Sequence, residues 1–175
     1  MKLEQQLRIR NISDNDILAA YNLTQAIYAS TDMMCEPFSE KYPDVASFEW
    51  EVNEYRRTRG AVFLLAELKE GLAGYVTVRP QAAAKLSHTA YLNMGVSESA
   101  RGKSVGRSLL SAAVSRLQAD KLIEILYLNV RADNHSAVRL YESAMFETLA
   151  VLNRDTKFDG KYYNGLLMRR LIECP

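Results

Sequence analysis

The residues best suited to chemistry lie in a loop near the middle of the chain, Arg101-Gly-Lys-Ser-Val-Gly106. The loop follows an apolar run typical of a strand and leads into segment 105–119, where apolar residues recur at helical spacing. Free backbone N–H groups point out of a helix N-terminus, and the helix dipole favours negative charge there. Because Lys103 and Arg107 add positive charge and small residues allow close approach, the segment predicts a site for a phosphorylated ligand.

The spacing of this loop narrows the identity of the ligand. The mononucleotide pattern of Gly, four residues and then Gly-Lys-Ser/Thr does not occur, and the dinucleotide pattern Gly-x-Gly-x-x-Gly is also absent. A solvated basic loop in front of an ordinary helix is the alternative interpretation of the same residues.

A second segment also places polar side chains at the end of an apolar run. The run 126–130 predicts a buried strand, and 135–144 predicts a short helix for which Asn134 is a good N-cap. Asn134 and Tyr141 are seven residues apart, close to two helical turns, so both face the same side of the helix. A half-buried aromatic residue on a helix face is the alternative for Tyr141.

Both segments resemble motifs of the GNAT family of N-acetyltransferases. The first resembles the signature Arg/Gln-x-x-Gly-x-Gly/Ala, whose loop wraps the pyrophosphate of acetyl-coenzyme A. The second, Asn134 to Glu142, is similar to the family pattern of an Asn followed by Ala-x-x-Leu-Tyr-Glu. Two positions depart from the family. Ser104 replaces a Gly, which makes positive φ less favourable there, and Met145 replaces another, so we expect that helix to end without an αL cap.

The end of the chain extends the resemblance. Segment 153–168 and the residues Ser87-His-Thr-Ala90 are similar to the branch that holds bacterial amino-acid and phosphinothricin-type N-acetyltransferases. The resemblance covers about 7–171, with strong motifs only between 90 and 146. It implies the GNAT fold, an α/β (α+β) fold in which about four helices flank a mixed, mostly antiparallel sheet whose central strands splay to admit acetyl-CoA.

The resemblance also implies roles for individual residues. Tyr141 would protonate the leaving thiolate, and Asn134 would contact the pantetheine arm. Met94 and Val96 would pair with that arm as an added strand does, and an N–H of Met94 or Gly95 would polarise the acetyl carbonyl. The full set of expected cofactor-binding residues is Met94, Gly95, Val96, Arg101, Gly102, Lys103, Ser104, Val105, Gly106, Arg107 and Asn134.

The expected activity is acetyl transfer from acetyl-CoA to the primary amine of a small molecule, a free amino acid, by direct attack on the thioester. Two alternatives stay open: an acetyltransferase acting on protein N-termini or lysines, and a non-catalytic acetyl-CoA-binding module. In the family, the loop 31–42 and the hairpin 154–163 line the acceptor pocket. The residues expected there are Met33, Met34, Phe38, Tyr91, Arg154, Tyr162 and Tyr163, with Arg154 meeting a carboxylate.

The general base is not evident in the sequence. Relatives often place a carboxylate where this chain has Tyr91, whose ordinary pKa of about 10 makes it a poor base at neutral pH. His88, Glu67 and Glu98 are further candidates, but a surface or structural role suits each of them as well. A water chain, or an amine that binds already deprotonated, would need no dedicated base.

Length and composition bound the protein class. The 175 residues predict a single N-acetyltransferase domain over 1–175, and 22 Lys and Arg against 21 Asp and Glu give no field for nucleic acid or an anionic membrane. Cys35, Cys174 and two distant His residues form no metal pattern, so no metal is expected. The first ten residues have no apolar leader, and we expect a cytoplasmic protein. A homodimer is left open.

Periodicity and turn signals predict the element order β-α-α-β-β-β-α-β-α-β-β. The expected strands are 7–10, 61–68, 72–79, 90–96, 125–130, 147–153 and 162–171, and the expected helices are 16–30, 44–59, 105–119 and 135–144.

Overall fold

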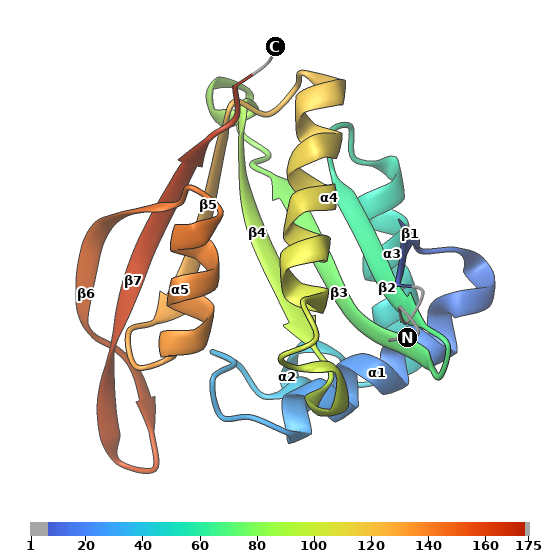
Figure 1. Cartoon of the computed structure of the whole chain (residues 1–175), viewed down its shortest axis with the longest axis horizontal. Coiled ribbons are helices and arrows are strands. Elements are labelled where there is room, and N and C mark those ends of the chain that lie inside the picture. Colours follow the sequence, from blue (N-terminus) through green and yellow to red (C-terminus); the bar gives the residue numbers. More distant parts are fainter. Residues whose placement is uncertain (1–6, 174–175) are drawn as a thin grey trace, which may run out of the picture.

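A seven-stranded sheet organises the residues that the computed structural model describes, 7–173 (Figure 1). The strands are β1 (Arg8–Asn11), β2 (Val62–Leu68), β3 (Gly71–Pro80), β4 (Thr89–Val96), β5 (Ile125–Arg131), β6 (Glu147–Phe158) and β7 (Lys161–Leu171). The helices are α1 (Ile17–Ala29), α2 (Phe38–Lys41), α3 (Val45–Arg57), α4 (Val105–Asp120) and α5 (His135–Ser143), with short 3-10 turns at Asp14–Asp16, Ala84–Leu86 and Glu98–Ala100.

The sheet order is β1-β2-β3-β4-β5-β7-β6, and every neighbouring pair is antiparallel except β4 and β5. The parallel pair is short, because only Thr89 to Tyr91 are matched, with Ile125 to Tyr127. Beyond that point the two central strands have no mutual pairing. The predicted fold class, a mostly antiparallel mixed sheet with central strands that splay, is confirmed.

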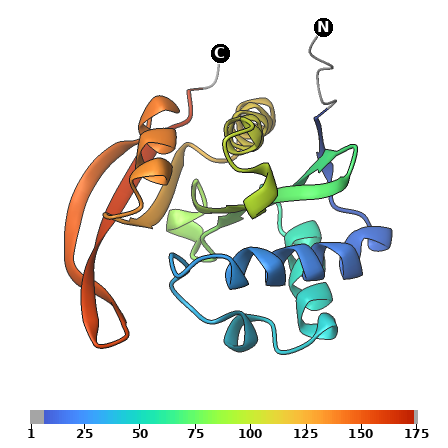
Figure 2. The same cartoon turned by 60° about the horizontal axis from the view of Figure 1, so that its bottom comes forward.

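Helices cover both faces of the sheet (Figure 2). Helices α1 and α3 pack below β1–β4 around a core that includes Ile27, Phe48 and Leu65. Helices α4 and α5 lie on the opposite face, where Leu109 and Leu126 belong to the larger core. Burial of these apolar side chains supplies the main driving force that holds the layers on the sheet.

Short-range signals set the ends of several elements. Asp44 caps α3, with its carboxylate accepting from the Ser47 N–H at 2.7 Å. Asp159 and Gly160 both have positive φ, 47° and 74°, which is the backbone of a type I′ turn and joins β6 to β7. Asp16 at the start of α1 accepts from the Ser13 N–H at 2.8 Å and pairs with Arg10 on β1.

The predicted order of the eleven main elements is confirmed, with two differences in extent. The polar loop after α1 contains the one-turn helix α2, which is too short to produce a periodic pattern. Strand β6 runs five residues past its expected end, to Phe158, with register shifts at Thr148/Ala150 and Leu152/Thr156. Bulges of this kind interrupt strict alternation, which hides the strand from pattern analysis.

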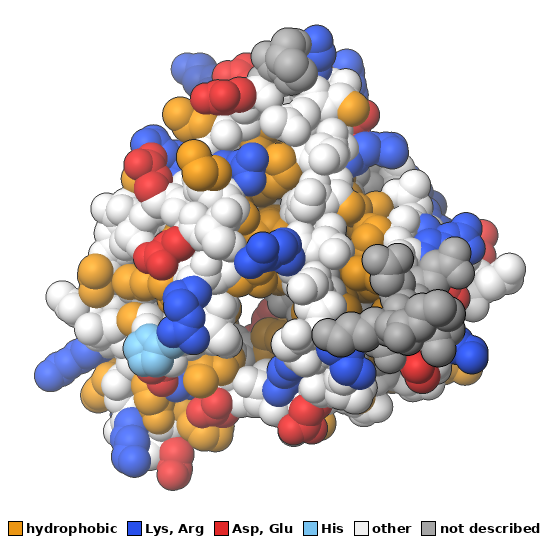
Figure 3. All heavy atoms as spheres, in the orientation of Figure 1, with side chains coloured by type: hydrophobic (Ala, Val, Ile, Leu, Met, Phe, Trp, Pro, Cys, Tyr) orange, Lys and Arg blue, Asp and Glu red, His pale blue; other side chains and the backbone are white. Residues whose placement is uncertain are grey.

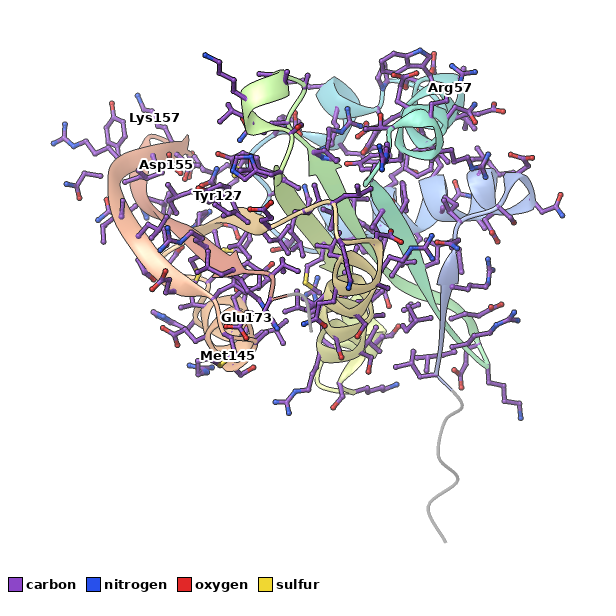
Figure 4. The ribbon with its side chains drawn as sticks, turned by 90° about the horizontal axis from the view of Figure 1, so that it is seen from above. Arg57, Tyr127, Met145, Asp155, Lys157 and Glu173 are labelled. Carbon is purple, nitrogen blue, oxygen red and sulfur yellow. The ribbon has the colours of Figure 1, made fainter. Side chains whose placement is uncertain are left out.

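The expectation about Met145 is wrong. Met145 takes φ 65°, and the Phe146 N–H donates to the Tyr141 carbonyl at 3.0 Å, so α5 ends in a left-handed residue although that residue is not Gly. Figure 4 labels Met145 at this end of the helix, and its side chain is 77% exposed. Of the helices within 7–173, none combines the length and apolar character needed to cross a membrane.

Candidate active site

A cleft of about 940 Å³ crosses the sheet where β4 and β5 diverge. Its walls come from both faces: Gly106, Ala137 and Tyr141 on the side of α4 and α5, and Tyr28 and Lys41 on the side of α1. Figure 3 shows the hollow between α4 and α5, with cationic side chains at its rim. The β4 edge from Leu92 onward borders this cleft, so its backbone groups are available to an extended ligand.

The predicted phosphate loop forms one end of the cleft. Gly102, Ser104, Val105 and Gly106 all line it, at the N-terminus of α4. Ser104 has φ 61° and ψ 9°, so it adopts the left-handed conformation that a Gly normally supplies, and the expected obstacle from its Cβ is not realised. The first amides of α4 have no intrahelical acceptor and face this end.

Close packing around Gly106 leaves little room for a side chain at this point. A Cβ built on it would lie 3.1 Å from Leu140 Cδ2 and 3.3 Å from Met94 Cε. The missing side chain leaves a narrow passage between α4, α5 and β4. A thin, extended arm such as pantetheine fits this passage, and the basic helix start at its end fits a pyrophosphate.

The three cations of the loop differ in their placement. Arg101 lines the cleft, but its guanidinium donates to Ser30 Oγ at 2.5 Å and to the Val96 carbonyl at 3.4 Å, which ties the loop to the end of α1. Arg107 lines the cleft and is exposed. Lys103 is exposed and is not among the lining residues. Arg107 is therefore the side chain best placed to meet a phosphate.

Asn134 and Tyr141 share the wall formed by α5, as their spacing predicts. Asn134 caps the helix, with Oδ1 accepting from the Ala137 N–H at 3.3 Å, so its amide N–H₂ remains available to a ligand. Tyr141 is 8% exposed, and burial raises the pKa of its phenol to about 12. The phenol is therefore protonated throughout the neutral range and can act as a proton donor.

The floor beside β4 depends on Gly95. A Cβ there would lie 2.9 Å from Tyr75 Cε1 and 3.0 Å from Ile27 Cγ2. The ring of Tyr75 packs directly against the strand for this reason, and burial raises the pKa of its phenol well above the ordinary value. Gly95 and its neighbour Met94 both border the cleft at this level.

Charged side chains line the cleft on the side of α1 and α3. Lys41 pairs with Glu36 at 2.8 Å, and Arg79 pairs with Glu51 at 3.0 Å. The Arg79 guanidinium also stacks over the Tyr55 ring, 4.4 Å from its centroid. Two ion pairs thus lie in the lining of the cleft, which also includes the apolar Met33 and Met34.

The residues expected at the acceptor pocket are only partly brought together. Met33, Met34 and Tyr91 line the cleft. Phe38 does not line it, because its ring packs against Tyr21, Tyr28 and Tyr42. Arg154 and Tyr162 are also outside the lining, with the Arg154 guanidinium 5.2 Å from the centroid of the Tyr162 ring on the exposed hairpin. Tyr163 reaches the site indirectly, beneath Arg131.

Three of the base candidates lie away from the cleft, and Tyr91 lines it. Glu67 pairs with Arg10 at 2.9 Å, and neither Glu98 nor His88 is a lining residue. Tyr91 lines the cleft and stacks near Tyr127, 5.6 Å between centroids, with 42% of its surface exposed. Within residues 7–173, no group of three or more His, Cys, Asp and Glu side chains is placed to hold a metal ion.

Sequence reasoning missed four charged residues that line the cleft, Lys41, Glu51, Arg79 and Arg131. Strand alternation carries a signal for Arg79, because it continues the face of β3 that holds Tyr75 and Thr77. No local pattern marks the others. Arg131, for example, contacts Asp32, 99 positions earlier in the chain.

Comparison with solved structures agrees with this geometry. A GNAT-family acetyltransferase from Streptococcus pneumoniae superposes with a TM-score of 0.90 over 95% of this chain and 100% of its own, at 23% identity. A phosphinothricin acetyltransferase from Sinorhizobium meliloti, solved in complex with acetyl-CoA, superposes with a TM-score of 0.84 over 95% of this chain and 88% of its own, at 18% identity.

A curated protein is also similar to this chain in sequence. An N-alpha-acetyltransferase of Saccharolobus solfataricus is 27% identical over 120 residues, 64% of this chain and 68% of that protein. The curated relative and a family match define the class: an N-acetyltransferase that uses acetyl-CoA. More particularly, the family model described as acetyltransferase (GNAT) matches residues 21–145, and the chain belongs to that family.

Proposed function

We propose that this N-acetyltransferase acetylates the primary amine of a free amino acid. The observation that carries the proposal is that the cations Lys41 and Arg79 line the same cleft as the apolar Met33 and Met34, a group of residues that we take as the acceptor mouth. A carboxylate prefers a guanidinium partner, and an apolar side chain prefers the methionines. Arg79 replaces Arg154 as the proposed carboxylate partner, because Arg154 lies outside the cleft.

The residues divide the chemical work between the two sides of the sheet. Acetyl-CoA supplies the acetyl group as a thioester when bound. The start of α4 and Arg107 hold the diphosphate, and Asn134 orients the arm beside the open β4 edge. An N–H of Met94 or Gly95 donates to the acetyl oxygen as negative charge develops there. The Tyr141 hydroxyl gives its proton to the departing sulfur.

Loss of the ammonium proton needs no dedicated carboxylate in this proposal. Glu36 and Glu51 at the acceptor mouth are each held in an ion pair, with Lys41 and Arg79, and Tyr91 offers a phenol rather than a carboxylate. The amine therefore reacts from its small neutral fraction or passes its proton to water. Activity should then rise with pH until the amine is neutral.

The decisive experiment is release of free thiol from acetyl-CoA against a panel of amino acids, their amides, polyamines, aminoglycosides and short peptides. For the preferred amino acid, Arg79→Gln should raise KM about ten- to a hundredfold, because loss of a charged hydrogen bond costs about 1.5–3 kcal/mol. The matching amide should be a poor substrate of the wild type and should lose little more in the variant. Arg79→Lys, which keeps the charge, serves as the matched control.

Acetylation of a peptide N-terminus is the second candidate, and one observation favours it: the Saccharolobus solfataricus relative is named an N-alpha-acetyltransferase. A peptide has no carboxylate next to the reacting amine, so it would gain nothing from Arg79. Preference for peptides over every free amino acid, with equal losses for acid and amide in Arg79→Gln, would reject the amino-acid proposal and support this one.

A further inference from the structure

Arg131, at the end of β5, is a charged side chain that is only 3% exposed and lies in the wall of the cleft. Its Nε and Nη2 donate to the two carboxylate oxygens of Asp133, at 3.0 Å and 2.6 Å. Its Nη1 donates to the main-chain carbonyl of Asp32 at 3.0 Å and lies 3.4 Å from that residue's Oδ2. The flat guanidinium rests on the Tyr163 ring, 3.7 Å from the centroid.

These contacts join three separate parts of the chain. Asp32 belongs to the loop 31–37 after α1, Asp133 precedes the Asn134 cap of α5, and Tyr163 lies on β7. A guanidinium presents its donors in a rigid plane that can meet a carboxylate bidentately, reach a third acceptor and stack on a ring at once. A lysine ammonium cannot reproduce that arrangement.

The loop has few other polar connections to the body of the protein, although Met34 also packs against the core beneath α1 and α3. Among the hydrogen bonds and ion pairs of the described residues, segment 32–37 is joined to the sheet only through Arg131. Its remaining polar contacts are local: Met33 N–H to Thr31 Oγ1 at 3.2 Å, the Glu36–Lys41 pair at 2.8 Å, and the Pro37 carbonyl at the start of α2. Yet Met33, Met34, Cys35 and Glu36 all line the cleft.

We infer that Arg131 is a positioning residue that holds the loop 31–37 against the cleft and thereby sets the affinity of the cleft for the acceptor. The assignment of this side to the acceptor rests on the proposed function. The ordering of the loop itself follows from the contacts alone. Arg131 touches no reacting atom in this account, because its donors are directed to Asp133 and to Asp32.

Removal of Arg131 should loosen the loop without unfolding the protein. The Asp133 and Asp32 side chains are 42% and 44% exposed, so water can solvate both carboxylates once their partner is gone. Burying an unpaired charge, the usual cause of severe destabilisation, does not arise here. The expected damage is local disorder of 31–37.

The first readout of the test needs no acceptor. Cys35 lies exposed in the loop. Partial burial, Asp155 and Glu36 raise the pKa of its thiol, whereas the charge of Arg131 lowers that pKa. In a Cys174→Ser background, Arg131→Met should release the loop and speed alkylation of Cys35 by iodoacetamide at least threefold. The rate is compared at a pH high enough to ionise the thiol fully, where loss of the Arg131 charge no longer changes the thiolate fraction. The affinity for acetyl-CoA, measured by calorimetry, should stay within twofold. Arg169→Met breaks the Arg169–Glu147 pair on the outer strands and should leave the alkylation rate unchanged.

The second readout uses the preferred acceptor from the substrate panel. Arg131→Met should raise the KM for that acceptor at least tenfold with kcat changed far less, and Arg131→Lys should restore only part of the loss. Tyr163→Leu, which removes the stacking ring but leaves the charge, should move both readouts in the same direction by a smaller factor. If the Arg131 variants do not fold, the Tyr163 variant decides.

Unchanged alkylation and acceptor KM in a folded Arg131→Met protein would overturn the inference. Equal losses of acceptor and acetyl-CoA affinity would overturn it too, since they would indicate general damage. Failure of every free amino acid as a substrate would reject the proposed acceptor, but the alkylation result would still stand by itself.

Discussion

Tyr141 combines burial with a place on the cleft wall, and this combination determines what the residue can do. The phenol has a pKa of about 12, raised by burial, so it stays protonated while a thiolate would form beside it. A buried proton donor loses little to competition from water. Its ring packs 5.8 Å from Phe146, which keeps the side chain in place at the end of α5.

Tyr141→Phe tests this role, because it keeps the ring and removes only the hydroxyl. We expect kcat to fall by roughly a hundredfold, within the usual range for a positioned acid, with little change in acetyl-CoA affinity. Since the pKa is about 12, the wild-type pH profile should show no loss of activity from this group up to about pH 11. Retention of more than half the wild-type kcat, with chemistry rate-limiting, would remove Tyr141 from the mechanism.

Gly106 is the second residue whose chemistry can be isolated. Gly106→Asp places a carboxylate in the phosphate-binding turn and a Cβ against Leu140, so acetyl-CoA affinity should fall at least tenfold, or about 1.4 kcal/mol. Gly106→Asn has nearly the same size without the charge. Calorimetry should show a smaller loss for Asn than for Asp, whereas unchanged affinity in a folded Asp variant would place the loop outside the site.

Residue identity predicted more about the cofactor side than about the acceptor side. The loop around Gly106 and the pair Asn134 and Tyr141 are local patterns, because each motif lies within about ten consecutive residues. The acceptor mouth is assembled from α1–α3, β3 and β5, whose contacts span tens of positions. No spacing rule could bring Arg131 to Asp32 or distinguish Arg79 from Arg154 before the sheet was in place.

At the scale of elements, two helix ends contain backbone strain that the sequence did not predict. Ser104 begins α4 and Met145 follows α5, both with positive φ, where a Cβ costs about 1–2 kcal/mol. We expected these replacements to alter the backbone, but the surrounding structure imposes the same conformation on them. Propensity therefore predicted the elements well and the conformation of their terminal residues poorly.

Met145→Gly should accordingly stabilise the protein. The side chain is exposed and φ is 65°, so Gly relieves strain while adding some entropy to the unfolded chain, for a net gain of about 0.5–1 kcal/mol. Met145→Ala keeps the strain and should leave stability nearly unchanged. Urea unfolding of the three proteins measures the difference, and equal midpoints would contradict the account.

The junction of β1 and α1 should govern part of the acid stability. Hydrogen bonds from Arg10 hold the pKa of the Asp16 carboxyl well below its ordinary value. Because the pKa of Asp16 is lower in the folded protein, the pair stabilises the fold fully above the ordinary carboxyl pKa of about 4. This stabilisation is lost as the pH falls toward the pKa of Asp16 in the folded protein. Asp16→Asn should lower the free energy of unfolding at pH 7 by about 2 kcal/mol and flatten its decline between about pH 4 and pH 2.

Asp14→Asn is the matched control for that measurement. Asp14 is exposed and pairs with Arg56 at the surface, so its loss should change stability at pH 7 by less than about 1 kcal/mol. If both variants shift the curve of stability against pH by the same amount, the buried pair has no special role.

At the scale of the whole molecule, acetyl-CoA should stabilise the fold. It would contact α4 and α5, which form the layer on one face of the sheet, and β4, which lies at the splayed centre of the sheet. At a hundredfold excess over Kd, binding contributes about 2.7 kcal/mol, which raises Tm by about 5–10 °C for a chain of this size. Differential scanning fluorimetry measures the shift, and at the same acetyl-CoA concentration it should fall to about half or less in Gly106→Asp.

The splay of β4 from β5 also has a kinetic consequence. Residues from both faces of the sheet line the cleft. In the proposed function the two substrates therefore enter from opposite faces, and neither blocks the route of the other. This arrangement requires no fixed order of substrate binding, and the amine can attack the thioester directly within one ternary complex. Double-reciprocal plots of initial rate at several fixed concentrations of the second substrate should therefore intersect. Parallel lines would indicate a double-displacement mechanism through an acetylated enzyme.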